Sequence, residues 1–227
     1  MIALLSDIHG NYPALSAVLA RLDRLGVNEL FCLGDTAGWA PQINECCAAL
    51  RERGAVGVRG NHDDYLVTGR LSGRSATADL CIAYQRTVIE TEHLEWLGAL
   101  PLVLSAFGIE AVHGGWDDPL EQYLREPSVE MFTGRQSGLF ASGHTHVPLL
   151  WEGAGIRYCN PGSVGQPRDS DPRASFAIVD GESMRIERVE YDIEATRAAI
   201  ASAGLPDYVG SSLPLGLPVG SHCRECR

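Results

Sequence analysis

Most histidines in this sequence lie in short polar segments that also contain aspartate, asparagine or glycine. Five of the seven do so: His9, His62, His113, His144 and His146. The chain begins MIALLSDIHGNYP, which places Asp7 and His9 two residues apart, directly after an apolar run. Further on come Gly34-Asp35, Gly60-Asn61-His62-Asp63, His113-Gly114-Gly115 and Gly143-His144-Thr145-His146. Imidazole nitrogens and carboxylate oxygens bind transition metals, so these segments indicate a metal site if the fold brings them together.

Taken singly, each segment has an ordinary structural explanation. Asp-x-His or Gly-Asp after a strand is more often a turn or a cap, and Gly60-Asn61-His62-Asp63 fits a loop because Asn and Asp tolerate turn geometry. His113 alone fits a hydrogen-bonded strand end. His144 and His146 form a stronger signal, since alternate residues of an extended segment project to the same side. A common structural cause for all five segments is hard to find, so the combination favours function.

The elements that must position these segments follow from the spacing of apolar residues. Apolar runs predict strands at 2–5, 30–33 and 55–58, and one-sided helical spacing predicts helices at 12–25 and 41–53. This β-α-β-α-β order implies parallel strands joined by right-handed crossovers. The polar segments follow the carboxyl ends of the strands, where the functional groups of parallel sheets gather.

The remainder of the chain predicts a helical insertion and further strands. Residues 64–100 are mostly helical by pattern, and we expect a helical patch at 120–125 and a closing helix at 193–203. Strands are expected at 102–104, 109–112 and 139–141, and then at 149–152, 156–159, 176–179 and 184–191 as in an antiparallel sheet. We therefore expect one α/β domain over residues 1–204, with two packed sheets and outer helices, and a flexible C-terminal tail over 205–227.

Composition narrows the classes of function. The chain has 227 residues, of which 45% are hydrophobic, and a net charge of -11, which disfavours general binding to nucleic acids. No apolar run approaches the roughly 20 residues that cross a bilayer, so we expect a cytoplasmic protein without membrane attachment. Cys32, Cys46, Cys47 and Cys159 are interpreted as reduced, buried residues. The tail pair Cys223-x-x-Cys226 is typical of a disordered end, with zinc binding or a redox response as alternatives.

The order Asp-x-His, Gly-Asp, Gly-Asn-His-Asp, His and Gly-His-x-His, matched from Asp7 to His146, resembles the calcineurin-like metallophosphoesterase superfamily. The later stretch Asn160–Arg168 is similar to the Pro-Gly-Ser turn of the small bacterial and archaeal phosphodiesterases of that superfamily. The resemblance covers nearly the whole chain except the tail. It implies a four-layer αββα sandwich, in which two mixed β-sheets are flanked by helices.

The resemblance also implies a pair of metal sites. Asp35 would bridge two divalent cations; the other ligands would be Asp7, His9 and His146 for the first cation and Asn61, His113 and His144 for the second. Two cations about 3.5–4 Å apart stabilise the attacking and leaving oxygens of a phosphate ester and lower the pKa of a bridging water, which then attacks in line. Manganese is the expected metal, and Fe, Ni, Co or Zn also suit these ligands.

Residues beside the metal ligands are candidates for catalysis and substrate binding. His62 is not used as a ligand in the superfamily pattern, and we expect it to act as the general acid that protonates the leaving oxygen. Asp63 is the candidate for its orienting partner. Arg168 and Arg59 are candidates for neutralising phosphate oxygens, together with Asn61 at the substrate. For Arg59, a solvated strand end remains an equal alternative.

Departures from the pattern bear on the substrate. Protein phosphatases and symmetrical dinucleoside-tetraphosphate hydrolases carry an arginine soon after Gly-Asp, whereas Thr36-Ala37-Gly38-Trp39 follows here. Gly38 also stands where the protein phosphatases have the aspartate that orients the catalytic histidine. The expected activity is therefore hydrolysis of small phosphodiesters or phosphomonoesters. A nuclease and a non-catalytic scaffold of the same fold are the alternatives.

The helical insertion at 64–100 would stand beside the metal site. We expect it to form a lid or one wall of the substrate pocket, with Arg70, Arg74 or Arg86 facing inward. A pair of solvated helices is the alternative. A homodimer is consistent with the resemblance alone.

Overall fold

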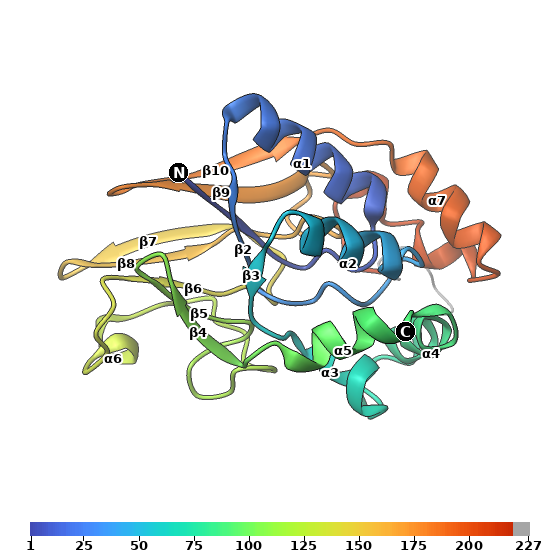
Figure 1. Cartoon of the computed structure of the whole chain (residues 1–227), viewed down its shortest axis with the longest axis horizontal. Helices are drawn as coiled ribbons and strands as arrows, with labels where there is room; N and C mark the ends of the chain where they lie inside the picture. The colour runs from blue at the N-terminus through green and yellow to red at the C-terminus, as the bar shows by residue number, and fades with distance from the viewer. Residues whose placement is uncertain (220–227) are drawn as a thin grey trace.

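Within residues 1–219, which the computed structural model describes, two mixed β-sheets of five strands each form the centre of the molecule (Figure 1). The strand order is β10-β9-β1-β2-β3 in the first sheet and β4-β5-β6-β8-β7 in the second. The strands of the first sheet are β1 (Ile2–Leu5), β2 (Glu29–Cys32), β3 (Val56–Gly57), β9 (Ala174–Asp180) and β10 (Ser183–Val189). Those of the second are β4 (Val103–Ala106), β5 (Ile109–Val112), β6 (Leu139–Ala141), β7 (Leu149–Gly153) and β8 (Ile156–Asn160).

Each sheet combines parallel strands with antiparallel edges. In the first sheet, β1, β2 and β3 run parallel, and β9 and β10 add to β1 in antiparallel fashion. In the second, β5, β6 and β8 run parallel, with β4 and β7 antiparallel at the edges. The carboxyl ends of the parallel strands in both sheets therefore face the same end of the sandwich, where polar segments follow them.

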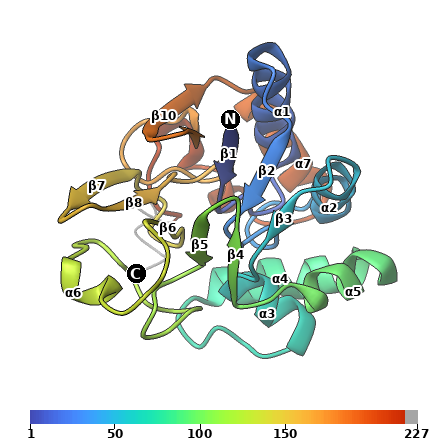
Figure 2. The ribbon, with the colours of Figure 1, turned by 60° about the vertical axis from the view of Figure 1, so that its left-hand side comes forward.

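The helices lie outside the sheets, which confirms the predicted sandwich of two mixed sheets flanked by helices. They are α1 (Tyr12–Leu25), α2 (Ile43–Glu52), α3 (Asn61–Thr68), α4 (Ala76–Val88), α5 (Thr91–Ala99), α6 (Val129–Phe132) and α7 (Ile193–Ser202). Figure 1 shows α1 above the first sheet, α2 and α7 to the right of its strands, and α3, α4 and α5 grouped below α2 and α7 at the same end. The same group lies beneath the sheets in the rotated view of Figure 2.

Helix α1 shows how the sequence specifies such an element. Its first turn is capped by the side chain of Asn11, which accepts a hydrogen bond from the backbone N–H of Ala14 at 3.2 Å. Leu15 and Val18 are fully buried against the sheet. Burying such a side chain contributes roughly 1.5–3 kcal/mol. The helix ends at Gly26, whose φ of 68° is a left-handed conformation that glycine adopts without strain.

The two sheets pack face to face through a layer of small and medium-sized side chains. Leu4 and Phe31 from the first sheet meet Ala111, Ala141 and Cys159 from the second, and all five are buried. Side chains of different sizes from the two faces together fill the space between the sheets.

Two details differ from the sequence-based expectation. The predicted helical patch at 120–125 is wrong, because this segment is a turn in which the Asp118 carboxylate accepts the N–H groups of Leu120 and Glu121, both at 3.1 Å. The four strands expected in one antiparallel sheet form two hairpins, β7–β8 and β9–β10, that belong to different sheets.

The segment expected to be loose also packs in part against the body. Two short 3₁₀ helices, η1 (Asp207–Val209) and η2 (Leu213–Leu215), bury Val209 and Leu213 against Trp39 and Cys81. The pair Cys223 and Cys226 lies outside the described residues. The cysteines at 32, 46, 47, 81 and 159 are buried and unpaired. Across residues 1–219, none of the helices combines the length and the apolar character that a membrane span needs.

Candidate metal centre

The polar segments that follow the strands meet at one end of the sandwich, and several hold their residues in a strained conformation. The backbone φ is 53° at Asp7, 53° at His9, 55° at Asp35, 64° at His144 and 59° at His146. Residues other than glycine pay about 1–3 kcal/mol for such a conformation, and they are concentrated at functional sites. The strain fixes where these five side chains point.

The first group of side chains joins Asp7, His9 and His146. Their ligand atoms lie within 4.8 Å of one another, and all three residues are buried. Nε2 of His9 is 3.1 Å from Nε2 of His146, and Nε2 of His146 is 3.2 Å from Oδ1 of Asp7. The expected ligands of the first metal therefore converge.

The second group forms around His113, which is fully buried. Its Nε2 lies 3.0 Å from Oδ1 of Asn61, 3.2 Å from Nδ1 of His144 and 3.4 Å from Oδ2 of Asp35. The same Oδ2 of Asp35 is 3.7 Å from Nε2 of His9 in the first group. Asp35 thus lies between the two groups, where a bridging ligand would have to be.

Backbone carbonyl groups hold three of the imidazoles from behind. Nδ1 of His9 donates to the carbonyl of Ala37 at 2.8 Å, and Nδ1 of His113 to that of Leu33 at 2.8 Å. Nδ1 of His146 donates to the carbonyl of residue 166 at 2.6 Å. Because a carbonyl only accepts, each bond places the proton on Nδ1 and turns Nε2 inward. Metal-binding histidines are commonly held in this way.

This arrangement fits one cation in each group, with Asp35 shared by both. When neutral, His9 and His146 face each other through lone pairs on Nε2, and two acceptors at 3.1 Å cannot form a hydrogen bond. Oδ1 of Asp7 is also a buried acceptor without a hydrogen-bond partner among the described residues. Buried acceptors are costly unless something pairs with them. The imidazole, carboxylate and amide donors suit a divalent transition metal, and Asp7 and Asp35 supply the negative charge.

The titration behaviour of the site reflects its burial and its crowded charges. Burial raises the pKa of Asp7 to about 7, although His113 opposes the shift. Burial lowers the pKa of His144 to about 3 and also holds the pKa of His146 well below the usual value. It disfavours charge on His113 as well, but the carboxylates of Asp35 and Asp7 outweigh it and raise the pKa of His113 to about 10. Without a cation, the site therefore retains protons that metal binding would displace.

Asp63 does not orient His62 as the sequence suggested. Its Oδ2 accepts the N–H groups of Asp35 at 2.9 Å and Gly60 at 3.0 Å, and its Oδ1 accepts that of Ala37 at 2.8 Å. Burial, aided by the charge of Asp35, raises the pKa of Asp63 to about 6. Successive residues of a helix point in different directions, so the neighbour of His62 in sequence braces the Asp35 loop instead.

The turn at 160–168 braces two other ligand segments. Oγ of Ser163 donates to the carbonyl of Asp7 at 2.7 Å, and the N–H of Gly165 donates to the same carbonyl at 3.0 Å. The side-chain amide of Asn160 donates to the carbonyl of Gly143 at 2.7 Å, next to the pair of histidines. This turn therefore positions the segments that carry candidate ligands.

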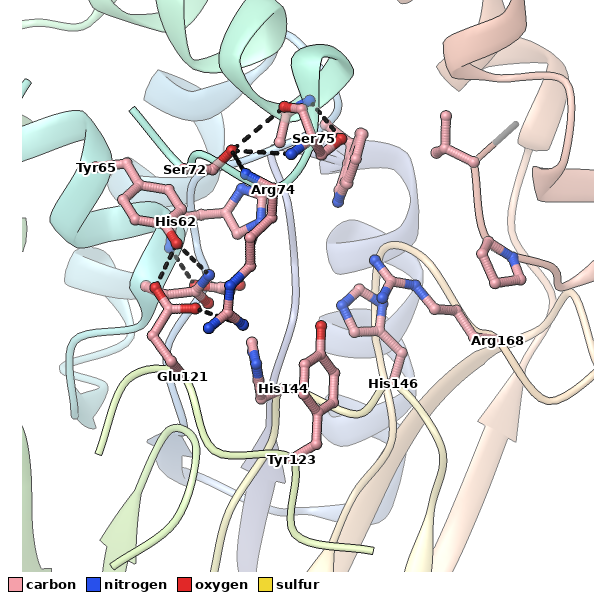
Figure 3. Close-up of a pocket in the computed structure, with 16 residues that line it drawn as sticks. His62, Tyr65, Ser72, Arg74, Ser75, Glu121, Tyr123, His144, His146 and Arg168 are labelled. Carbon is pink, nitrogen blue, oxygen red and sulfur yellow. Dashed lines mark hydrogen bonds and ion pairs between the residues drawn. The ribbon is translucent and has the colours of Figure 1, made fainter. Parts of the chain in front are cut away.

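A pocket of about 250 Å³ opens onto both groups of ligands, and Figure 3 shows the side chains around it. Its volume lies near the lower limit of small-molecule sites, which are about 300–1,000 Å³. Arg168 lines it, held by bonds from Nε and Nη2 to Oε1 of Gln166 at 3.2 and 2.7 Å. His62 also lines the pocket; its Nε2 is 4.0 Å from Oδ2 of Asp35, and its Nδ1 has no partner among the described residues.

Arg59 is not brought to this pocket. Its Nη1 donates to the carbonyl of Gly98 at 3.3 Å, and its Nε lies 3.5 Å from the Asp64 carboxylate. The sequence-based assignment of Arg59 to phosphate oxygens is therefore corrected. Its position just after β3, next to Gly60, was the misleading signal, because the side chain turns toward α5.

Other pocket residues were missed by the sequence interpretation. Trp39, Tyr65, Glu121 and Tyr123 line the pocket, and the Tyr123 ring packs on that of His144 with centroids 4.1 Å apart. The segment with Glu121 and Tyr123 starts only a few residues after His113. That proximity in sequence was the one available signal.

The helical insertion supplies part of the pocket wall, which the sequence analysis expected as an alternative to a pair of solvated helices. Arg74 lines the pocket, and its guanidinium points toward Glu121 in Figure 3. Arg70 stacks over the Tyr65 ring, with 5.3 Å from its Cζ to the ring centroid. Arg86 lies against Gly69 and does not line the pocket. Whether the insertion moves as a lid stays a prediction.

Comparisons with known proteins agree with this geometry. The chain is 36% identical to an uncharacterized protein of Methanocaldococcus jannaschii, over 95% of this chain and 98% of that protein. It is 26% identical to the phosphodiesterase YfcE of Escherichia coli, over 80% of this chain and 88% of that protein. The crystal structure of a metallophosphoesterase from Sphaerobacter thermophilus superposes with a TM-score of 0.84 at 33% identity, covering 95% of this chain and 99% of that one. The calcineurin-like phosphoesterase superfamily domain matches residues 1–184, and the chain belongs to that superfamily.

Proposed function

We propose that this protein is a metal-dependent phosphoesterase that hydrolyses small phosphodiesters or phosphomonoesters with two divalent cations. The observation that carries the proposal is the pair of inward-facing imidazole nitrogens on His9 and His146, 3.1 Å apart. A cation would accept the lone pairs of both nitrogens. Asp7, His9 and His146 would hold one cation, and Asn61, His113 and His144 the other. Asp35 would bridge the two.

When bound, the two cations supply charge stabilisation for the phosphate oxygens and an activated water for in-line attack. The chain's own residues do the rest. Arg168 binds non-bridging phosphate oxygens through its guanidinium, because it enters the pocket beside His146 (Figure 3). The carbonyl-anchored imidazoles keep the ligand atoms in place during turnover.

His62 protonates the leaving oxygen in this proposal. Its ring lies between those of His9 and Tyr65, with centroid distances of 4.8 and 5.7 Å, so it is fixed at the edge of the metal centre. Burial lowers its pKa, which makes the protonated ring a stronger acid and reduces the protonated fraction at neutral pH. We therefore expect the activity that depends on His62 to fall as pH rises.

The size and charge of the site favour a small ester over a nucleic acid. The pocket of about 250 Å³ suits one phosphate with a modest organic group. The net charge of -11 repels a polynucleotide backbone, which counts against the nuclease. Convergence of all seven expected ligands counts against a scaffold that has lost its site. Manganese as the native metal, a cytoplasmic location and a homodimer stay predictions from the sequence.

Turnover by metal-loaded protein tests the proposal. Manganese-loaded protein should hydrolyse bis-p-nitrophenyl phosphate, and Asp35→Asn should lower kcat/KM by more than about a hundredfold. Asp23→Asn is the control, because Asp23 is an exposed partner of Arg53 far from the pocket. Turnover by Asp35→Asn that equals wild-type turnover would refute the proposal. Wild-type protein that binds no metal and shows no turnover would refute it as well. Cleavage of plasmid DNA without cleavage of the diester would favour the nuclease.

A further inference from the structure

The side chain of Asn61 has two chemically different ends, and only one of them can serve a cation. Its Oδ1 lies 3.0 Å from Nε2 of His113, on the side of the second group of ligands. Its Nδ2 donates to Oη of Tyr65 at 3.3 Å. An amide turned by 180° would present hydrogen-bond donors to the cation instead of a lone pair. The bond to Tyr65 selects the orientation that can bind a metal.

Tyr65 accepts that bond because its own proton is directed elsewhere. The Tyr65 hydroxyl donates to Oε1 of Glu121, which leaves an oxygen lone pair for the Asn61 amide. The two residues come from different parts of the chain, α3 and the turn after β5.

Arginines of the helical insertion in turn position the side chain of Glu121. Nη1 of Arg74 lies 3.3 Å from Oε2 of Glu121, and Nη2 of Arg70 lies 3.9 Å from Oε1. The Glu121 side chain is only 17% exposed, so its charge needs such partners. Figure 3 shows Tyr65, Glu121 and Arg74 joined by these contacts on one wall of the pocket.

We propose that Tyr65 and Glu121 are a positioning pair that fixes the amide of Asn61 with Oδ1 toward the second metal and so sets the affinity of that metal site. The inference rests on the proposed dinuclear centre, because it concerns one of its two sites. Neither residue contacts the first group of ligands through a hydrogen bond within the described part of the chain. The pair therefore affects the two sites unequally, which a general structural role would not do.

Manganese titration of Tyr65→Phe and Glu121→Gln tests this pair, followed by electron paramagnetic resonance of the free ion. In Tyr65→Phe, one site should keep wild-type affinity and the other should weaken about 10–100-fold, as for other groups that orient metal ligands. The manganese concentration for half-maximal activity should rise by the same factor. Glu121→Gln should shift the same site less, because glutamine still accepts one hydrogen bond.

The double variant gives a second measure of the pair. Both residues act through Asn61. The double variant Tyr65→Phe/Glu121→Gln should therefore bind manganese at the second site at most about twofold more weakly than Tyr65→Phe alone. Tyr84→Phe and Glu110→Gln are the controls. Tyr84 packs in the cluster around Trp39 and Val209, and Glu110 is a similarly buried carboxylate, 14% exposed, paired with Arg135. Both should titrate as the wild type does.

The outcomes separate this inference from the proposed function. Two manganese ions in wild-type protein with active turnover, but an unchanged second site in Tyr65→Phe, would overturn the positioning pair alone. Equal weakening of both sites would overturn it too. Wild-type protein that binds fewer than two ions would overturn both statements. If Tyr65→Phe fails to fold, Glu121→Gln carries the same test by itself.

Discussion

Replacing Gly38 by alanine should disturb the metal centre through one imidazole. A Cβ at Gly38 would lie 2.0 Å from Nδ1 of His9, whereas ordinary contact begins at 3.4 Å. The imidazole or the loop must therefore move by at least about 1.4 Å, and metal–ligand distances tolerate only about 0.2 Å. The hydrogen bond from His9 to the carbonyl of Ala37, which belongs to the same loop, would be lost or distorted.

The magnitude has two parts. The φ of 142° at Gly38 is a conformation that alanine avoids, which should cost about 1–3 kcal/mol of unfolding free energy. Displacement of His9 should weaken manganese binding at the first site by about a hundredfold or more. The second site, built around His113, should change much less. Binding is measured by calorimetric titration and stability by urea unfolding of the metal-free protein.

Gly138→Ala is the matched control for this experiment. Gly138 is exposed, and a Cβ there would meet nothing within 4 Å. We expect wild-type stability and two unchanged metal sites in the control. A folded Gly38→Ala protein, judged by circular dichroism, with wild-type affinity at both sites would refute the placement of His9 as a ligand.

Further predictions concern charge and hydrogen bonding around the same centre. Since a metal must displace the protons on Asp7, with a pKa of about 7, and on His113, with a pKa of about 10, manganese affinity should rise with pH. At the first site, which contains Asp7, affinity should rise about tenfold per unit below pH 7 and level off above it. At the second site, which contains His113, it should rise about tenfold per unit from pH 7 to 9. A flat profile at both sites in a chelator competition assay would contradict this. Asp63→Asn removes an acceptor from a carboxylate that binds three N–H groups, so unfolding free energy in urea should fall by about 1–3 kcal/mol. His62→Gln should slow hydrolysis of an alkyl ester about 100-fold or more and of a p-nitrophenyl ester far less, because a poor leaving group needs the proton; equal slowing would argue against a general acid. Arg168→Lys should raise KM for the diester about tenfold with little change in kcat, since the planar fork of the guanidinium is lost, and an unchanged KM would remove Arg168 from substrate binding.

The sequence was sufficient to predict that the candidate ligands converge, because each follows a strand with a clear pattern. The run before Asp7 and the strand before His113 are buried apolar segments, and parallel strands bring their carboxyl ends to one side. The local spacing of apolar residues therefore predicted which distant segments of the chain come together. The positive φ of Asp7 and the carbonyl bonds behind the imidazoles did not follow from residue types, because they depend on the exact path of each loop.

Contacts between irregular segments could not be predicted from the sequence. Tyr65 and Glu121 are 56 residues apart, and one of them lies in a turn whose Leu120 and Leu124 imitate helical spacing. In the C-terminal segment, some packing contacts exist where the sequence predicted none. Its Gly, Pro and Ser content predicted a loose tail, but Val209 and Leu213 are spaced four residues apart and pack beside Trp39.

An anomalous difference map from crystals grown with manganese tests the central claim most directly. Two peaks about 3.5–4 Å apart should appear, one bound by Asp7, His9 and His146 and the other by Asn61, His113 and His144. Both should lie within coordination distance of Asp35. A single peak would contradict the dinuclear centre. Peaks outside these side chains would also contradict it, for example peaks at Glu90, Glu92 and His93, where ligand atoms also come within 4.8 Å of one another.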